Sequence, residues 1–323
     1  MEKILSNLYR IEVPLPNNPL KVLNSYVILG TDRNLIIDTG FNRKECKNAI
    51  EEGLNKLKID LNNTDFFITH LHADHSGLVT QLATENSKIY CSKYDGNIIN
   101  LSTGNTQWSD YRKFAQTTGF SEDELEILAT KHPGFKYNTS EKIDFCYIED
   151  GDIIDIGEYS FRCLHTPGHT KGHMCLYEKS KKILISGDHI LGDITPNISL
   201  WSDEYNPLGN YINSLDMVYD MDIDIVLPGH RSILKDHRKR IDELKGHHRQ
   251  RLDEVIDILE DKEMIGYEVA SNMHWDMTYE NFEEFPAPQK WFAVGEAIAH
   301  LKYLEEKGDI NRKIVDGNIV YFI

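Results

Sequence analysis

Four side chains that can bind a metal or move a proton fall within six positions of this chain. They are His70, His72, Asp74 and His75, and they follow the apolar run 66–68. A turn at the end of a strand can aim such side chains into one cavity. Imidazole and carboxylate groups together suit zinc, iron or manganese. The motif therefore predicts a metal site rather than a polar, histidine-rich turn.

Three further clusters each place a potential ligand after an aliphatic run. His169 lies in Thr-Pro-Gly-His-Thr, Asp188 in Ser-Gly-Asp, and His230 in Pro-Gly-His. Glycine or proline beside a ligand position lets the backbone approach a metal closely. A lone histidine after an apolar run is usually a buried core residue, but an ordered series of such clusters favours a shared metal site.

These motifs resemble those of the metallo-β-lactamase-fold hydrolase superfamily over residues 1–235. The resemblance implies an α/β protein with the four-layer αββα sandwich and a two-metal site at one edge. It implies three ligands for the first metal, three for the second and one bridging carboxylate. In that order, the implied ligands are His70, His72 and His169; Asp74, His75 and His230; and Asp188. Asp38, in Ile-Ile-Asp-Thr-Gly, matches a residue that orients the ligand loop.

This chain differs from some branches of the superfamily at single ligand positions, and these differences disfavour some activities. Many true β-lactamases of this fold have Cys where this chain has Asp188, and they lack a histidine equivalent to His75. Antibiotic hydrolysis is therefore disfavoured. Flavodiiron relatives have Glu in place of His72, which argues against an oxygen- or nitric-oxide-reducing activity. The run Thr-Pro-Gly-His-Thr-Lys-Gly-His most resembles hydroxyacylglutathione hydrolases and related thioesterases or lactonases.

The implied ligand set predicts hydrolysis by two divalent metals. Two such ions sharing a water can lower its pKa from about 15.7 towards about 7, and the resulting hydroxide attacks a carbonyl or phosphoryl centre. We expect Asp74 and Asp188 to be catalytic as well as ligating, with Asp188 orienting the nucleophile. Zinc is the expected metal, although iron and manganese accept the same ligands.

The expected substrate is a small-molecule ester, a thioester or a lactone, and the chemistry of the leaving group favours the thioester. A thiolate needs little protonation, whereas a phosphodiester or an amide needs a general acid. His165 and His173 are the candidates for such an acid. We expect instead that His165 is structural and that His173 orients its neighbours. His189 is expected to point away from the metals.

Composition and charge bound the remaining possibilities. The chain has 35 Lys and Arg against 52 Asp and Glu, a formal charge of −17, which opposes general binding to nucleic acid. Its five cysteines are scattered without a Cys-x-x-Cys pair, and residues 1–6 do not begin a signal peptide. We expect a cytoplasmic protein with no membrane contact. A homodimer stays possible.

Hydrophobic periodicity predicts two β-rich layers with outer helices. The strand-like runs are 8–13, 26–29, 35–38, 66–69, 88–91, 153–156, 159–164, 174–177, 182–186 and 223–227. The helical runs in the first 235 residues are 44–57, 75–84, 106–117 and 121–131. The last of these opens with Ser121 and has Glu124 three residues later, which is a capping-box pattern.

Two stretches are candidate walls of a substrate pocket. Residues of about 93–148 look inserted into the fold and contain Trp108 and Tyr111. These aromatic side chains either cover the metals as a lid or pack the insertion against the sandwich or a second subunit. The loop 195–211, with Trp201 and Tyr205, is the second candidate wall.

The region 236–323 looks like a separate winged-helix-like domain. It has predicted helices at 236–259, 265–272 and 289–307, followed by a hairpin with an Asp-Gly turn. In this it is similar to the C-terminal domain of the β-lactamase-like endoribonuclease family. Its 12 Lys and Arg against 19 Asp and Glu give −7. The last helix carries Lys290, Glu296, Lys302, Glu305 and Glu306, so it lacks the basic face that reading a groove requires. We expect it to pack on the catalytic domain and shape the pocket.

Three functions therefore remain, in order of support. The first is a two-metal hydrolase of a small thioester or lactone. The second is a metal-dependent endoribonuclease or phosphodiesterase, supported by the C-terminal resemblance and opposed by charge. The third is a non-catalytic ligand-binding protein on the same fold, which loss of a ligand would favour, and none of the seven is missing.

Overall fold

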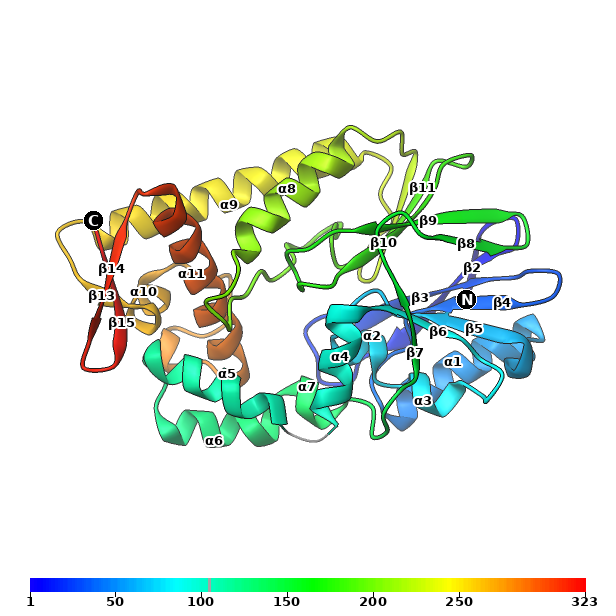
Figure 1. Ribbon diagram of the computed structural model, residues 1–323, viewed down its shortest axis with the longest axis horizontal. Coiled ribbons are helices and arrows are strands. Elements are labelled where there is room, and N and C mark those ends of the chain that lie inside the picture. Colours follow the sequence, from blue (N-terminus) through cyan, green and yellow to red (C-terminus); the bar gives the residue numbers. More distant parts are fainter. Residues whose placement is uncertain (104–105) are drawn as a thin grey trace.

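Two facing sheets form one end of the molecule, and a small third sheet forms the other (Figure 1). The computed structural model describes residues 1–103 and 106–323, without the side chains of 106–108 and 135. The first sheet has the order β1 (Glu2–Leu5), β2 (Leu8–Pro14), β3 (Val22–Ile28), β4 (Asn34–Ile37), β5 (Thr64–Phe67), β6 (Ile89–Ser92) and β7 (Phe145–Ile148). The second has the order β12 (Ile225–Pro228), β11 (Ile183–Gly187), β10 (Met174–Glu178), β9 (Tyr159–His165) and β8 (Ile153–Ile156).

Strands buried on both faces hold the sandwich together. On β5, Phe66 packs outward beneath the helices, and Phe67 packs inward between the sheets. On β10, Leu176 faces inward and Cys175 faces outward. Because successive side chains of a strand point to opposite faces, such continuous apolar runs require a cover on each face.

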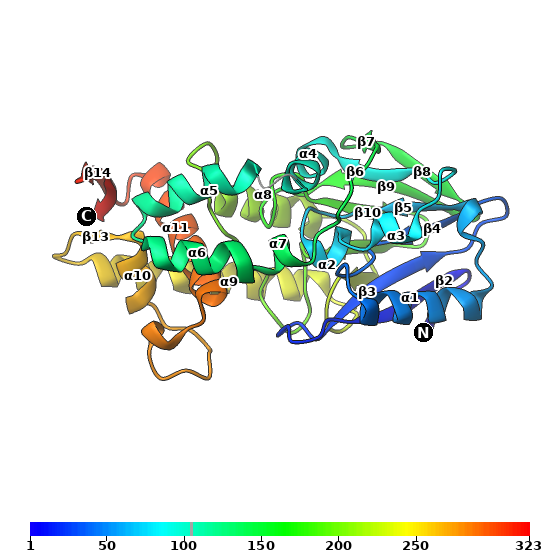
Figure 2. The ribbon, with the colours of Figure 1, turned by 90° about the horizontal axis from the view of Figure 1, so that it is seen from below.

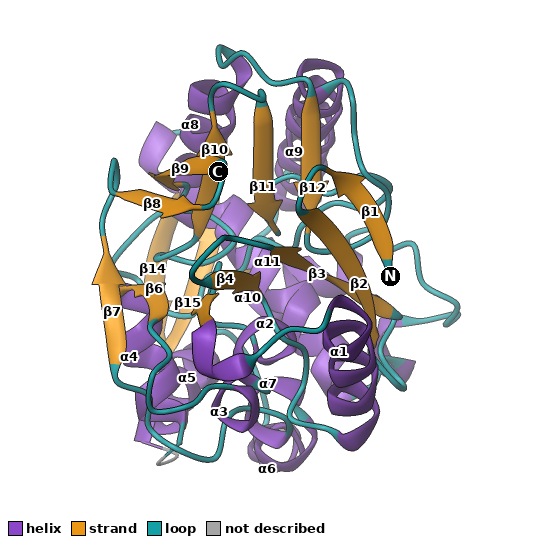
Figure 3. Ribbon diagram, turned by 90° about the vertical axis from the view of Figure 1, so that its right-hand side faces the viewer, coloured by secondary structure: helices purple, strands orange, loops and turns teal. Residues whose placement is uncertain are grey.

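Helices supply those covers, as Figure 3 shows. The first sheet is covered by α1 (Lys44–Leu57), α2 (Ala73–Ser76), α3 (Val79–Leu82) and α4 (Lys93–Ser102). The second is covered by α8 (Pro207–Tyr219) and α9 (His237–Leu259). The predicted four-layer αββα sandwich is therefore confirmed. None of the helices in the described ranges is long and apolar enough to cross a membrane.

Two predicted elements differ in detail from the structure. The predicted helix 75–84 is divided into α2 and α3, because the Leu78 N–H donates to the Gly40 carbonyl instead of continuing the helix. The predicted loop 195–211 ends early, since Asn206 caps α8 and Pro207 occupies its first turn.

The stretch 93–148 begins and ends against the first sheet. It starts with α4 and finishes with β7, which pairs with β6 in parallel. Between them lie α5 (Thr106–Thr117), α6 (Glu122–Lys131) and α7 (Pro133–Lys136). The predicted capping box of Ser121 and Glu124 is present at the start of α6. Figure 2 shows α5 and α6 beside the C-terminal region rather than over the sheet.

The C-terminal region has the predicted order of helices and hairpin. After α9 come β13 (Met264–Ile265), α10 (Gly266–Asn272), α11 (Ala287–Lys307), β14 (Asn311–Val315) and β15 (Asn318–Phe322). The last two strands pair around Asp316 and Gly317, both with positive φ, and β13 joins them on the other edge of β15. Assignment of this region as a winged helix stays a prediction.

A single apolar cluster joins this region to the sandwich. It includes Leu125 of α6, Leu184 of β11, Leu215 of α8 and Ile298 of α11, all fully buried. The last helix is therefore part of the core that supports the second sheet, not a surface appendage.

We predict that Ile298→Ala lowers the free energy of unfolding of the whole chain by about 2–5 kcal/mol, because it leaves a cavity in the shared cluster. Urea unfolding measures the effect. The matched control is Ile314→Ala on β14, where the side chain is 77% exposed and the change should stay within about 0.5 kcal/mol. Equal losses in the two variants would contradict a shared core.

Candidate metal centre

Asp38 fixes the orientation of two of the expected ligands. It follows β4, has φ of 58° and is 2% exposed. Its Oδ1 accepts from the Thr69 N–H at 2.9 Å, and its Oδ2 accepts from Thr69 Oγ1 at 2.8 Å and from His75 Nδ1 at 2.7 Å. Since the Thr69 hydroxyl donates to Asp38, its oxygen accepts from His70 Nδ1, 3.0 Å away. Both His70 and His75 are left with a lone pair on Nε2.

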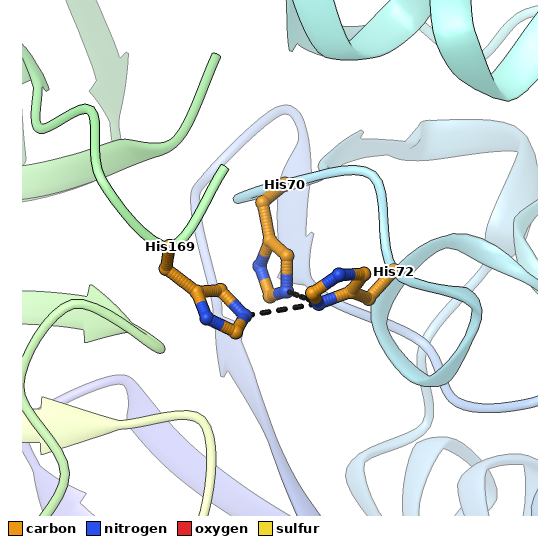
Figure 4. Close-up of side chains that lie close together, drawn as sticks. All are labelled: His70, His72 and His169. Carbon is orange, nitrogen blue, oxygen red and sulfur yellow. Dashed lines mark hydrogen bonds between the residues drawn. The ribbon is translucent and has the colours of Figure 1, made fainter. Parts of the chain in front are cut away.

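His70, His72 and His169 form the first group of ligand atoms, and Figure 4 shows their rings close together. His72 Nδ1 lies 3.0 Å from His70 Nε2 and 2.9 Å from His169 Nε2. His169 Nδ1 donates to the Asn197 carbonyl at 2.8 Å, so its Nε2 also carries a lone pair. Burial lowers the pKa of His72 to about 3, which keeps this ring neutral at neutral pH.

Asp74, His75 and His230 form the second group. His230 Nδ1 donates to the Val22 carbonyl at 2.7 Å, which leaves a lone pair on Nε2. This atom lies 3.2 Å from His75 Nε2 and 3.4 Å from Asp74 Oδ2. Three electron-rich atoms thus face one another.

Asp188 lies between the two groups. Its Oδ1 is 3.5 Å from His75 Nε2, and its Oδ2 is 3.6 Å from both His169 Nε2 and His230 Nε2. Within the described part of the chain, the buried Oδ1 has no hydrogen-bond partner. A Cβ at Gly229 would lie 2.7 Å from that oxygen, so glycine is required for this close approach.

These donor sets fit divalent cations. Buried lone pairs that face one another at about 3 Å repel, and a positive ion between them removes the repulsion. Metal ligands must also be deprotonated, and bonds from the other ring nitrogen to a carboxylate or carbonyl are typical of ligating histidines. The structure thus brings the seven expected side chains together, in clusters able to bind metal.

Asp95, which the sequence analysis did not single out, connects the two histidine loops. Its Oδ2 accepts from the Leu71 N–H at 2.9 Å and from Thr170 Oγ1 at 2.6 Å, and its Oδ1 accepts from the Gly172 N–H at 2.9 Å. The side chain is fully buried, and burial raises its pKa to about 6 despite these donors. The only sequence signal is an acidic residue in the first turn of α4, which is equally typical of an ordinary helix start.

The other histidines near the site have defined partners or positions. His165 Nε2 donates to the Lys171 carbonyl at 2.9 Å, as expected of a structural histidine. His173 Nε2 accepts from the Asp188 N–H at 3.2 Å, and its Nδ1 lies 2.8 Å from Thr166 Oγ1. His189 is absent from the ligand groups found among the described residues.

A cavity of about 930 Å³ opens beside His72 and His169. Tyr111, Trp201 and Tyr205 line it, as the pocket prediction requires, while the side chain of Trp108 lies outside the described residues. Sequence reasoning missed two further lining groups, Trp291 and Phe292 of α11. The rings of Trp201 and Trp291 stack with centroids 3.4 Å apart. In the sequence, both Trp291 and Phe292 belong to an apolar stripe that predicts core packing.

The chain belongs to the metallo-beta-lactamase superfamily, which residues 20–230 match. Residues 282–322 match the metallo-beta-lactamase-like, C-terminal domain. Solved structures with this fold cover nearly all of the chain. A metallo-beta-lactamase family protein from Thermus thermophilus is 26% identical, with a TM-score of 0.78 over 99% of both chains. A beta-lactamase domain protein from Burkholderia ambifaria is 24% identical, with a TM-score of 0.81 over 99% of this chain and 94% of that one.

Curated relatives include hydrolases and thioesterases. The probable metallo-hydrolase YqjP of Bacillus subtilis is 25% identical and covers 97% of this chain and 96% of its own length. The human acyl-coenzyme A thioesterase MBLAC2 is 24% identical and covers 64% of this chain and 72% of its own. The superfamily is hydrolytic, and its fold implies a divalent metal site where the histidine and aspartate clusters lie.

We predict that Asp95→Ala lowers zinc affinity by about 10–100-fold, because the two loops that carry the histidines lose their common acceptor. Titration against a competing chelator measures this affinity. Asp144→Ala, at an exposed aspartate just before β7, serves as the control and should bind zinc like the wild type. Unchanged affinity in Asp95→Ala would show that the loops hold their positions without it.

Proposed function

We propose that this protein is a hydrolase of small-molecule thioesters that uses two divalent metal ions, zinc in the first instance. The observation that carries the proposal is the convergence of seven ligand side chains, five of them buried, beside an aromatic-walled cavity. His70, His72 and His169 would hold one ion, Asp74, His75 and His230 the other, and Asp188 both. A non-catalytic role is disfavoured since the ligand set is complete.

Bound metals would supply Lewis acidity and a water of lowered pKa. The protein supplies orientation. Asp188 Oδ1 can accept a hydrogen bond from the attacking water, since no described group occupies it. A carboxylate that binds a divalent ion must be deprotonated, so the side chain of Asp188 would act only as an acceptor. His75 and His230 hold their rings through Nδ1 bonds to Asp38 and to the Val22 carbonyl.

The surroundings favour a leaving group that needs no acid. His165 donates its Nε2 proton to a carbonyl, and His173 is fully buried against the Asp188 backbone. His132 lines the cavity, but burial lowers its pKa to about 4, so it is neutral at neutral pH. A thiolate departs without protonation, whereas an amine or an alkoxide does not. The thioester is therefore preferred to an amide or a phosphodiester.

The composition of the cavity and the relatives support the same substrate class. Tyr111, Trp201, Tyr205 and Phe292 present an apolar surface suited to an acyl group. The similar proteins include thioesterases named for acyl-coenzyme A and, from Aspergillus fumigatus, for atrochrysone carboxyl ACP. The Aspergillus fumigatus protein is 24% identical over 76% of this chain and 46% of its own length.

The position of α11 argues against the endoribonuclease alternative. Lys290 pairs with Glu124 at 3.2 Å and is 13% exposed, and Lys302 pairs with Asp203 at 3.2 Å and is 11% exposed. These cations are neutralised within the molecule. Lys307, at the exposed end of the helix, does not by itself make a basic face to place in a groove.

Lys171 supports a substrate that carries an anionic group. Its Nζ lies 4.9 Å from the centre of the Tyr94 ring and 5.5 Å from that of Tyr205, in the cavity lining beside His169. Among the described residues, no carboxylate is within ion-pair distance of it. The aromatic rings hold the ammonium group in place while leaving its charge available to a carboxylate or phosphate.

We predict metal-dependent cleavage of acyl-coenzyme A, and none of bis-p-nitrophenyl phosphate or short RNA. Chelator should abolish the activity and zinc should restore it. Asp188→Asn should lower kcat/KM by more than about 100-fold, beyond the usual effect of losing a residue that only supports a ligand. Free thiol release and phosphodiester cleavage are the two readouts. If the wild type cleaved RNA but no thioester, and Asp188→Asn lost the RNA cleavage, the endoribonuclease alternative would replace the thioester proposal.

We predict that Lys171→Met raises KM about 5-fold for thioesters with a free carboxylate or phosphate and leaves KM for neutral thioesters unchanged. This factor corresponds to about 1 kcal/mol, as for an exposed ion pair. Lys113→Met is the matched control, since Lys113 also lines the cavity but lies 3.6 Å from Asp110. Equal effects on charged and neutral substrates would refute an anion-binding role.

A further inference from the structure

The carbonyl that orients His169 lies in a loop without regular structure. Asn197 provides this carbonyl, in the segment between β11 and α8. Loops are the more mobile parts of a fold unless their backbone or side chains are bonded to rigid elements. The position of the His169 ring therefore depends on what holds Asn197.

The side chain of Asn197 is bonded to α11. Its Nδ2 donates to Glu296 Oε2 at 2.9 Å and to the Phe292 carbonyl at 3.3 Å. Two acceptors one helical turn apart fix the direction of the amide. Glu296 of α11 thus contacts Asn197, and Asn197 contacts the proposed metal ligand His169.

The next part of the same loop is matched to α11 as well. The Leu200 N–H donates to the Gly295 carbonyl at 3.0 Å. A Cβ on Gly295 would lie 2.6 Å from the ring of Trp201, so the loop approaches the helix where a side chain is absent. Main-chain and side-chain contacts thus join the loop to this turn of α11.

Glu296 is held in turn by α9. Its side chain is 12% exposed, and its Oε1 lies 3.9 Å from Arg251 Nε. Arg251 is anchored by the His274 carbonyl at 2.6 Å and by Glu254 at 2.7 Å. Burial raises the pKa of Glu296, but one of its oxygens can accept from Asn197 in either protonation state.

We propose that Glu296 is a positioning residue which, through Asn197, fixes the ring of His169 for metal binding. The C-terminal region then contributes to metal affinity as well as to the cavity wall. This inference rests on the proposed function, because it concerns the ion held by His70, His72 and His169. It predicts that α11 controls one of the two ions and not the other, whose ligands His75 and His230 bond to Asp38 and Val22 instead.

The test replaces the donor amide by an acceptor. Asn197→Asp has the same shape but places a carboxylate oxygen against Glu296 and the Phe292 carbonyl. Cobalt(II) titration with a competing chelator measures the affinity for each of the two ions, apart from any catalysis. We expect one ion to bind about 10–100-fold more weakly and the other to bind as in the wild type.

The rescue variant is Asn197→Asp combined with Glu296→Gln, which reverses donor and acceptor. The glutamine amide can donate to the aspartate, so most of the lost affinity should return. Glu296→Gln alone should be near the wild type, because its carbonyl oxygen still accepts from Asn197. Glu296→Ala removes the acceptor and should weaken the same ion, so the test holds even where Asn197→Asp does not fold.

The matched control is Glu306→Ala, which removes another α11 carboxylate that bonds a residue of the same segment, Asn206, at 2.8 Å. It should bind both ions normally. Wild-type affinity in both Asn197→Asp and Glu296→Ala, or equal weakening of both ions, overturns the positioning role. Wild-type protein that binds fewer than two ions defeats the proposed function instead, and this is measured before any variant is made.

Discussion

The buried carboxylate of Asp38 is the contact on which the rest of the site depends. Through one oxygen it holds His75, and through the Thr69 hydroxyl it determines which nitrogen of His70 carries the proton. One side chain therefore aims a lone pair towards each of the two ligand groups. Asp38 directly follows β4, a central strand of the first sheet, so its position is set by the hydrogen bonds of that sheet.

Each of the two sheets provides part of the proposed ligand set. The first sheet and its loops provide His70 to His75, while loops of the second sheet provide His169, Asp188 and His230. Neither half has a complete ligand set, so their relative position must be maintained across the interface. Asp95 joins the two halves by accepting hydrogen bonds from both histidine loops. The helix α11 contributes through Glu296, which accepts from Asn197 in the loop that orients His169. The contacts that join the two halves therefore also hold the proposed ligands in place.

The sequence predicted the layers, and the candidate ligands that it singled out lie close together, because both features depend on side-chain type and spacing. Helix 44–57 has the predicted bounds, and the Asp-Gly hairpin turn near the C-terminus is present. Asn197 could not be found in this way, since it acts on His169 through a main-chain carbonyl that every residue possesses. Trp291 and Phe292 were missed for a related reason. An apolar stripe on a helix predicts burial, but it does not tell a core from the wall of a cavity.

The shared apolar cluster explains why a region that resembles a separate domain belongs to the site. Residues of α11 pack against α6, α8 and α9, so the helix cannot move without disturbing the support of the second sheet. Its polar contacts then act on a rigid frame: Lys290 and Lys302 are engaged in ion pairs, and Glu296 faces Asn197. A surface suited to nucleic acid would leave such cations free. Here they stabilise the wall of a cavity whose other side is formed by proposed metal ligands.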